Sequence, residues 1–90
     1  MPYIKAENRH HIDKHIGRHV RILTPGDLNY AFTLLLDRYI QEHGLSYQHL
    51  NDVMGALEGA KMELYRRVIV PYETQKMLEN GDVYTPRSPR

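Results

Sequence analysis

Three cations and a tyrosine stand close together between residues 61 and 67, and their types suit the binding of a phosphorylated ligand: Lys61, Tyr65, Arg66 and Arg67. The planar guanidinium group of arginine matches the oxygens of a phosphate group, and the ammonium group of lysine binds phosphate as a point charge. A tyrosine ring can stack on a base. The segment therefore predicts a nucleotide site, with Tyr65 against a base and the cations on the phosphates.

Four further residues are candidates for the same site, because they supply rings for a base or groups that bond base edges and ribose: Tyr30, Tyr72, Asp27 and Asn29. The sequence has seven tyrosines and no tryptophan, although tyrosine also serves oligomer interfaces. Lys61 has a structural alternative, because on a helical wheel its stem lies along an apolar stripe. Its ammonium group either pairs with Glu58 or Asp27 or points into a cavity and meets a phosphate.

Metal binding and catalysis have less support in the sequence. His11, His15 and His19 are spaced by four residues, so a helix would place them on one face, where neutral imidazoles can hold zinc or nickel. Three ligands on one helix leave the coordination incomplete, and we expect a polar or partner-facing edge with no metal and no cofactor. No nucleophile and base stand at an interpretable spacing, and no glycine-rich phosphate loop follows a strand. We therefore expect a protein that is not an enzyme.

Composition limits the class of protein. A chain of 90 residues suffices for one domain. Its formal net charge of +1, with acids and bases interleaved, argues against general DNA or RNA binding, which usually uses a strong basic patch. No apolar run is long enough for a membrane span, and the N-terminus lacks the apolar core of a signal peptide. Since cysteine is absent, a reducing compartment is favoured, and we expect a cytoplasmic protein with no membrane partner.

The spacing of apolar residues predicts helices in the first half of the chain. A first amphipathic helix is expected over residues 7–23. A second begins at Thr24-Pro25-Gly26-Asp27, where the threonine caps the helix, the proline suits its first turn and the aspartate closes a capping-box-like pattern. It ends at Gly44 through a glycine cap. This second helix is apolar on more than one face, which is typical of a central or interface helix.

The second half of the chain predicts one long helix and one short one. The long helix begins at Ser46 as its cap and continues to Val70. We expect it to stop or kink there, because Pro71 lacks an amide hydrogen and disfavours helical geometry in the preceding residue. A short helix over residues 72–79 follows and ends at Asn80-Gly81.

Together these elements predict an all-α fold, a small helical bundle of three main helices plus a short C-terminal helix. We expect a single domain over residues 1–84 with an N-terminal arm, followed by a disordered basic tail over residues 85–90. Gly55 and Gly59 stand inside the long helix, where glycine costs up to about 1 kcal/mol relative to alanine. Either a helix from this chain or a second copy approaches closely there, or the helix tolerates its glycines. We expect the domain to assemble as a homo-oligomer, either a dimer or a tetramer.

Six short motifs carry a resemblance to a known family: Pro2-Tyr3-Ile4, Gly26-Asp27-Leu28-Asn29-Tyr30, Gly55-x-Leu57-Glu58, Glu63-x-Tyr65-Arg66-Arg67, Pro71-Tyr72-Glu73 and Asn80-Gly81-Asp82-Val83-Tyr84. In this order they resemble a family of short phage and environmental proteins described as a domain of unknown function. Small oligomeric phage proteins of this size include the anti-CBASS and anti-Thoeris sponges, which sequester nucleotide messengers of bacterial anti-phage defence.

The resemblance implies a function that fits the residues named above. We expect a phage immune-evasion protein that binds a cyclic nucleotide second messenger in pockets between protomers and does not cleave it. The alternative is a small oligomeric adaptor or inhibitor that binds a protein and has no small-molecule ligand, since tyrosine and arginine also dominate protein interfaces.

Overall fold

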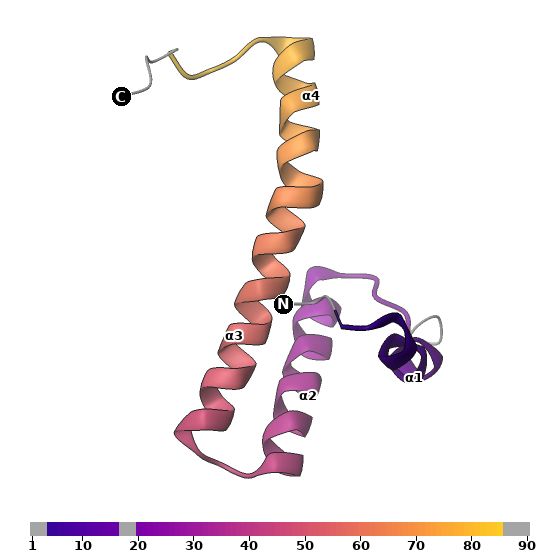
Figure 1. Cartoon of the computed structure of the whole chain (residues 1–90). Helices are drawn as coiled ribbons and strands as arrows, with labels where there is room; N and C mark the ends of the chain where they lie inside the picture. Colours follow the sequence, from indigo (N-terminus) through magenta and orange to yellow (C-terminus); the bar gives the residue numbers. More distant parts are fainter. Residues whose placement is uncertain (1–3, 17–19, 86–90) are drawn as a thin grey trace.

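The computed structural model describes residues 4–16 and 20–85, and all of the regular structure in these ranges is helical (Figure 1). This confirms the predicted all-α class. Within the same ranges, no helix combines the length and the apolar content needed to cross a membrane. The elements in chain order are α1 Ala6–Ile16, α2 Pro25–His43, α3 Tyr47–Leu64, a π-helical segment η1 Tyr65–Ile69, and α4 Val70–Asn80.

The start of α2 is fixed by a reciprocal cap. The Thr24 hydroxyl accepts a hydrogen bond from the Asp27 amide at 3.0 Å. The Asp27 carboxylate in turn accepts from the amides of Leu23 at 3.0 Å and of Thr24 at 3.3 Å. Amides at the start of a helix have no partner within the helix, so this capping box satisfies three of them and confirms the predicted start.

A tight connection then turns the chain back on itself, so that α3 runs antiparallel to α2 (Figure 1). Gly44 ends α2 with a φ of 94°, a backbone conformation that residues with a side chain rarely adopt, and its amide donates to the Ile40 carbonyl. Ser46 caps α3 by accepting from the His49 amide at 3.2 Å. Both predicted boundaries of this hairpin are confirmed.

Contrary to expectation, the helix that begins at Tyr47 does not stop or kink at Val70. The segments α3, η1 and α4 form one joined helix from Tyr47 to Asn80, so the predicted separate C-terminal helix is wrong (Figure 1). The physical reason is the π segment immediately before Pro71. The Val70 amide bonds to the Tyr65 carbonyl, five residues back, and this wider turn accommodates the missing donor and the ring of Pro71 without breaking the helix.

The first helix is shorter than its apolar spacing predicts. Its described part spans Ala6–Ile16, and residues 20–23 are not helical, so the prediction of one helix over residues 7–23 is wrong. Packing between separate helices in the described part of the chain is confined to α2 against α3. The predicted arm residues Pro2 and Tyr3, and most of the predicted tail, lie outside the described ranges.

The chain has almost no core of its own. Val53, on the side of α3 that meets α2, is 8% exposed and is the one buried apolar residue among those described. The chain exposes 8766 Å² of surface, whereas a compact monomer of this mass exposes about 5,500 Å². Its radius of gyration is 17.8 Å, whereas a compact domain of this length has about 12 Å. A single copy is therefore an open hairpin with an extended helix and not a closed bundle.

Candidate functional site on the joined helix

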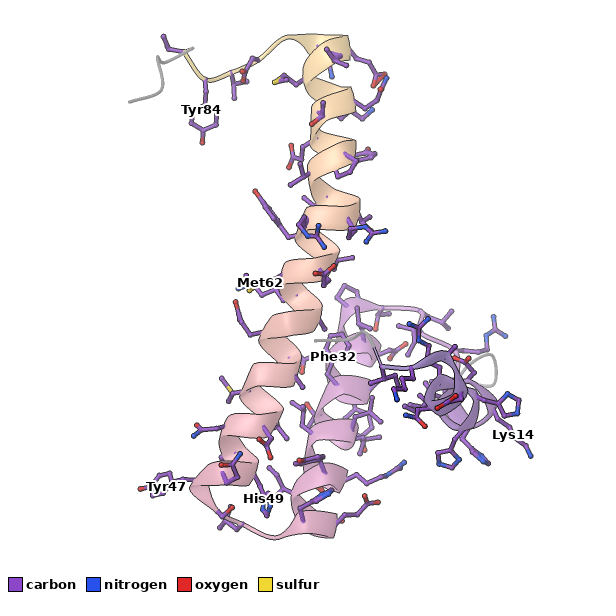
Figure 2. All side chains as sticks on the ribbon, viewed as in Figure 1. Lys14, Phe32, Tyr47, His49, Met62 and Tyr84 are labelled. Carbon is purple, nitrogen blue, oxygen red and sulfur yellow. The ribbon has the colours of Figure 1, made fainter. Side chains whose placement is uncertain are left out.

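A shallow recess of about 590 Å³ opens where α3 passes into the π segment. Figure 2 labels Met62, one of its residues, on the side of the joined helix that faces away from α2. The wider π turn changes the angular spacing of side chains here, so consecutive residues contribute to one concave surface. The lining residues are Lys61, Met62, Glu63, Leu64, Tyr65, Arg66, Ile69 and Val70.

Two of the predicted phosphate-binding cations line this recess, and each has an acidic neighbour. Arg66 Nη2 donates to both carboxylate oxygens of Glu63, at 3.0 and 2.9 Å. Both hydrogen bonds come from one guanidinium nitrogen, and the Glu63 side chain is 17% exposed whereas that of Arg66 is 65% exposed, so the pair orients the guanidinium group and leaves it accessible. Lys61 Nζ lies 3.8 Å from Glu58, and both side chains are exposed. Of the two predicted ion-pair partners for Lys61, the structure therefore brings it to Glu58, in a pair that contributes about 0–1 kcal/mol.

The structure divides the eight predicted site residues between three places. Lys61, Tyr65 and Arg66 line the recess, and Arg67 lies on the same π segment without lining it. Tyr72 lies one turn further on, with Lys76 Nζ 5.5 Å from its ring centroid.

The remaining three residues belong to α2 and do not line the recess. Asp27 is engaged in the helix cap through its carboxylate. The backbone carbonyl of Asn29 accepts from the Thr33 hydroxyl at 3.0 Å, and Tyr30 is exposed on the same helix.

A second recess, of about 610 Å³, lies between α4 and the segment that follows it. Tyr65 lines this recess as well as the first one, so its ring stands between two concave surfaces. The far wall includes Asp82 and Tyr84, whose backbone amide donates to the Asp82 carboxylate at 3.0 Å. The sequence did not predict this recess. The signals that could have found it are the turn at Asn80-Gly81 and the tyrosine that follows it, Tyr84, because both form part of its wall.

A cluster of tyrosine and histidine side chains joins α2 and α3 at the connected end of the hairpin. The Tyr39 hydroxyl donates to Asp52 at 3.0 Å, and this hydrogen bond to a carboxylate, together with partial desolvation and the carboxylate charge, raises the pKa of Tyr39 above its ordinary value. The ring of His43 stacks on Tyr39 with centroids 4.1 Å apart. Because a carbonyl only accepts, His43 and His49 each donate through Nδ1, to the carbonyls of Tyr39 and Gly44. These contacts tie the two helices and their connection together.

The predicted histidine face of α1 is present in part. The rings of His11 and His15 lie 4.9 Å apart in an edge arrangement, and His19 lies outside the described residues. Among the described residues no three side chains of the metal-binding types come together.

A family model described as a domain of unknown function, DUF6899, matches residues 1–83. The match covers nearly the whole described chain, including the hairpin, the first recess and all of the second recess except Tyr84. No curated protein and no solved structure matches the chain.

Proposed function

The chain belongs to the DUF6899 family, and from its recess we propose that it is an oligomeric binding protein that sequesters a cyclic nucleotide second messenger without cleaving it. The observation that supports the proposal is the convergence of Lys61, Tyr65 and Arg66 on one recess of the joined helix. In this proposal the protein acts in the cytoplasm of a host cell as a phage immune-evasion protein.

The recess supplies groups of the kind that a nucleotide needs. In the proposed complex the guanidinium group of Arg66 meets a phosphate in the orientation that Glu63 imposes on it, and the ring of Tyr65 stacks on a base. The carboxylate of Glu63 would lie near that phosphate and repel it. The charges of Lys61 and Arg67 must therefore outweigh this repulsion, which makes the affinity fall as salt screens the cations.

The absence of cleavage is part of the proposal and has a chemical basis. Hydrolysis of a phosphodiester needs a general base or a metal-bound water beside the reacting phosphorus. Glu63 is the one carboxylate that lines the recess, and it is engaged with Arg66. A carboxylate held by an arginine is a poor base, because the neighbouring cation stabilises its ionised form.

Isothermal titration calorimetry against a panel of cyclic dinucleotides, cyclic trinucleotides and cyclic ADP-ribose isomers tests the proposal. We expect one class to bind at a fixed ratio to protomers, and chromatography of the released ligand to return it intact. The Arg66→Gln variant should bind at least about tenfold more weakly. The matched control is Lys76→Gln, which removes a cation from an exposed pair with Glu79 that lies outside this recess.

Three results would contradict the proposal. If no member of the panel binds to the folded protein, the ligand class is wrong. If Arg66→Gln and Lys76→Gln bind the messenger equally well, the site is elsewhere. Release of a linear product in place of the cyclic one would make the protein an enzyme.

A second candidate function is a protein-binding adaptor or inhibitor. The observation that favours it is the exposed apolar surface of α4, which includes Tyr72, Met77 and Leu78. Aromatic and methionine side chains are enriched in protein interfaces. Capture of a specific host protein by the purified chain, with no affinity for any nucleotide, would select this function over the first.

A further inference from the structure

Seven residues of the joined helix repeat with the alternating spacing of a coiled coil. The intervals between them are three and four residues in turn, from the first turn of α3 into the π segment. Six are apolar and one is a lysine. We call them the seam: Tyr47, Leu50, Met54, Leu57, Lys61, Leu64 and Val68. A repeat of this kind places all its members along one side of a helix, where they pack into the side chains of a facing helix.

The chain does not cover this seam itself. The hairpin partner α2 packs against α3 around Val53, which lies between Leu50 and Leu57 on the helix surface, so α2 borders the seam along one edge and leaves these two leucines 36% and 38% exposed. Within the seam, Leu57 is 38% exposed and Leu64 is 53% exposed. Tyr47, at the start of the seam, points away from α2 in Figure 2.

The far half of the joined helix has a similar need for a partner. The stretch from Tyr65 to Asn80 packs against no other helix among the described residues and stands apart in Figure 1. It contains Val68, Ile69 and Val70, whose branched side chains lower helix propensity. In proteins most of the stability of a helix comes from tertiary packing of one face and not from helix propensity. A helix of this composition therefore needs tertiary contacts to persist.

The exposed area is large enough to be covered by a second copy of the same chain. The excess over a compact monomer is on the order of 3,000 Å² per chain, or about 6,000 Å² for two chains, which is enough to supply the roughly 2,000–5,000 Å² or more that obligate homodimers bury in total. A chain with one buried apolar residue needs this contact in order to fold, and a second copy is the one partner present wherever the chain is made. Closed two-fold dimers are also the commonest protein assemblies.

We propose that two copies pack seam against seam, with their joined helices antiparallel. Lys61 favours this orientation through charge repulsion, and a polar residue at one seam position of a coiled coil also specifies register. In a parallel pair the two Lys61 ammonium groups would face each other. In an antiparallel pair Lys61 of each copy faces a leucine layer of the other, and the acid Glu58, one residue after Leu57, lies beside that layer.

The antiparallel arrangement also meets the need of the far half of the helix. With Lys61 opposite Leu57, the Tyr65–Pro71 part of each copy lies along the start of the partner's α3, so the first half of each unpartnered stretch gains a neighbour. The two recesses at the π segments then lie on either side of the two-fold axis, and cations from both copies approach a shared region. This inference rests on the self-association part of the proposed function and does not depend on the ligand.

Sedimentation equilibrium of the purified protein without nucleotide tests the dimer. The mass of one chain is 10.6 kDa, and we expect an even multiple of it. Leu57→Glu combined with Leu64→Glu should give monomers that lose most of their helical circular dichroism. The matched control Met62→Glu places the same charge on the same stretch of helix but off the seam, and it should keep the wild-type mass.

Two further measurements keep the proposal falsifiable if the double variant fails to fold. Lys61→Leu removes the polar residue from the seam, so we expect the dimer to dissociate at about tenfold lower concentration. Because the chain has no cysteine, Glu79→Cys accepts one spin label per copy. The labels should lie more than about 45 Å apart if the helices are antiparallel, from the rise of about 1.5 Å per residue.

Several results would overturn the inference. These are a monomeric wild-type protein, an odd multiple of the chain mass, or a double variant that keeps the wild-type mass. A label separation below about 25 Å would show parallel helices. Since no nucleotide is present in these experiments, failure to bind a messenger leaves the dimer standing, and a monomeric protein that still binds a messenger would overturn the dimer alone.

Discussion

A substitution at Asp27 tests whether this residue stabilises the start of α2 or binds the ligand, because its carboxylate accepts hydrogen bonds in the helix cap. It accepts hydrogen bonds from the amides of Leu23 and Thr24, and its charge lies at the positive end of α2. Loss of an N-terminal cap typically costs about 0.5–2 kcal/mol, and the charge at the helix end contributes about 0.3–1 kcal/mol. Both amides are exposed and can bond to water, which places the total toward the low end. We expect Asp27→Ala to lower the free energy of unfolding by about 1–2 kcal/mol.

Urea denaturation followed by circular dichroism, at one fixed protomer concentration, measures this change. The matched control is Asp37→Ala on the same helix, where the carboxylate accepts from the exposed Gln41 side chain, and we expect a change below about 0.5 kcal/mol. Nucleotide affinity of the folded Asp27→Ala protein should equal that of the wild type, since Asp27 does not line the recess. Equal destabilisation by the two variants would refute the capping argument, and loss of affinity alone would make Asp27 a ligand residue.

Four further substitutions test the hairpin, the π segment and the glycines. Tyr39→Phe removes the hydrogen bond to Asp52 and should lower the urea concentration at the unfolding midpoint. Because the pKa of Tyr39 is raised in the folded state, the stability from this hydrogen bond is present below pH 10.0 and is lost as the pH rises through the folded pKa. The stabilities of the wild type and the variant should therefore converge in strongly alkaline buffer. An unchanged difference would contradict the role of the Tyr39 hydroxyl as the donor to Asp52. Pro71→Ala should let the preceding turn relax to an α-helix, seen as slower amide hydrogen exchange there, whereas unchanged exchange would mean that another residue imposes the π turn. Gly44→Ala should destabilise the fold by about 1–3 kcal/mol, since the positive φ at this position strains any residue with a side chain. Gly55→Ala should stabilise the fold by up to about 1 kcal/mol, since a Cβ at this position meets no atom within 4 Å. A destabilised Gly55→Ala protein would place a partner helix against this face of α3.

Features encoded within a few consecutive residues were predictable from the sequence. The cap at Thr24 and Asp27 depends on side chains three residues apart, and the glycine at position 44 ends a helix through its own backbone freedom. Lys61, Tyr65 and Arg66 meet in one recess because residues within two turns of a helix are neighbours whatever the tertiary fold. Local chemistry decided these features, and the structure agrees with them.

Features that depend on which helix geometry the backbone adopts, or on tertiary packing, were not predictable from the sequence. Pro71 removes a donor, and the sequence did not reveal that a wider turn at Tyr65–Ile69 would absorb this loss in place of a helix end. The apolar stripe of the first helix continues past Ile16, but periodicity does not give the end of a helix that lacks a partner to pack on. The side of α3 that α2 covers is likewise a matter of tertiary packing, so the placement of Asn29 and Tyr30 outside the recess required the structure.

Native mass spectrometry of the wild-type protein mixed with the cyclic nucleotide panel tests the account most directly, because it reports assembly and ligand in one spectrum. The account predicts ions at an even multiple of the 10.6 kDa chain that carry an intact cyclic nucleotide at a fixed ratio to protomers. Ions of the single chain with no nucleotide attached, under conditions that preserve known complexes, would contradict it.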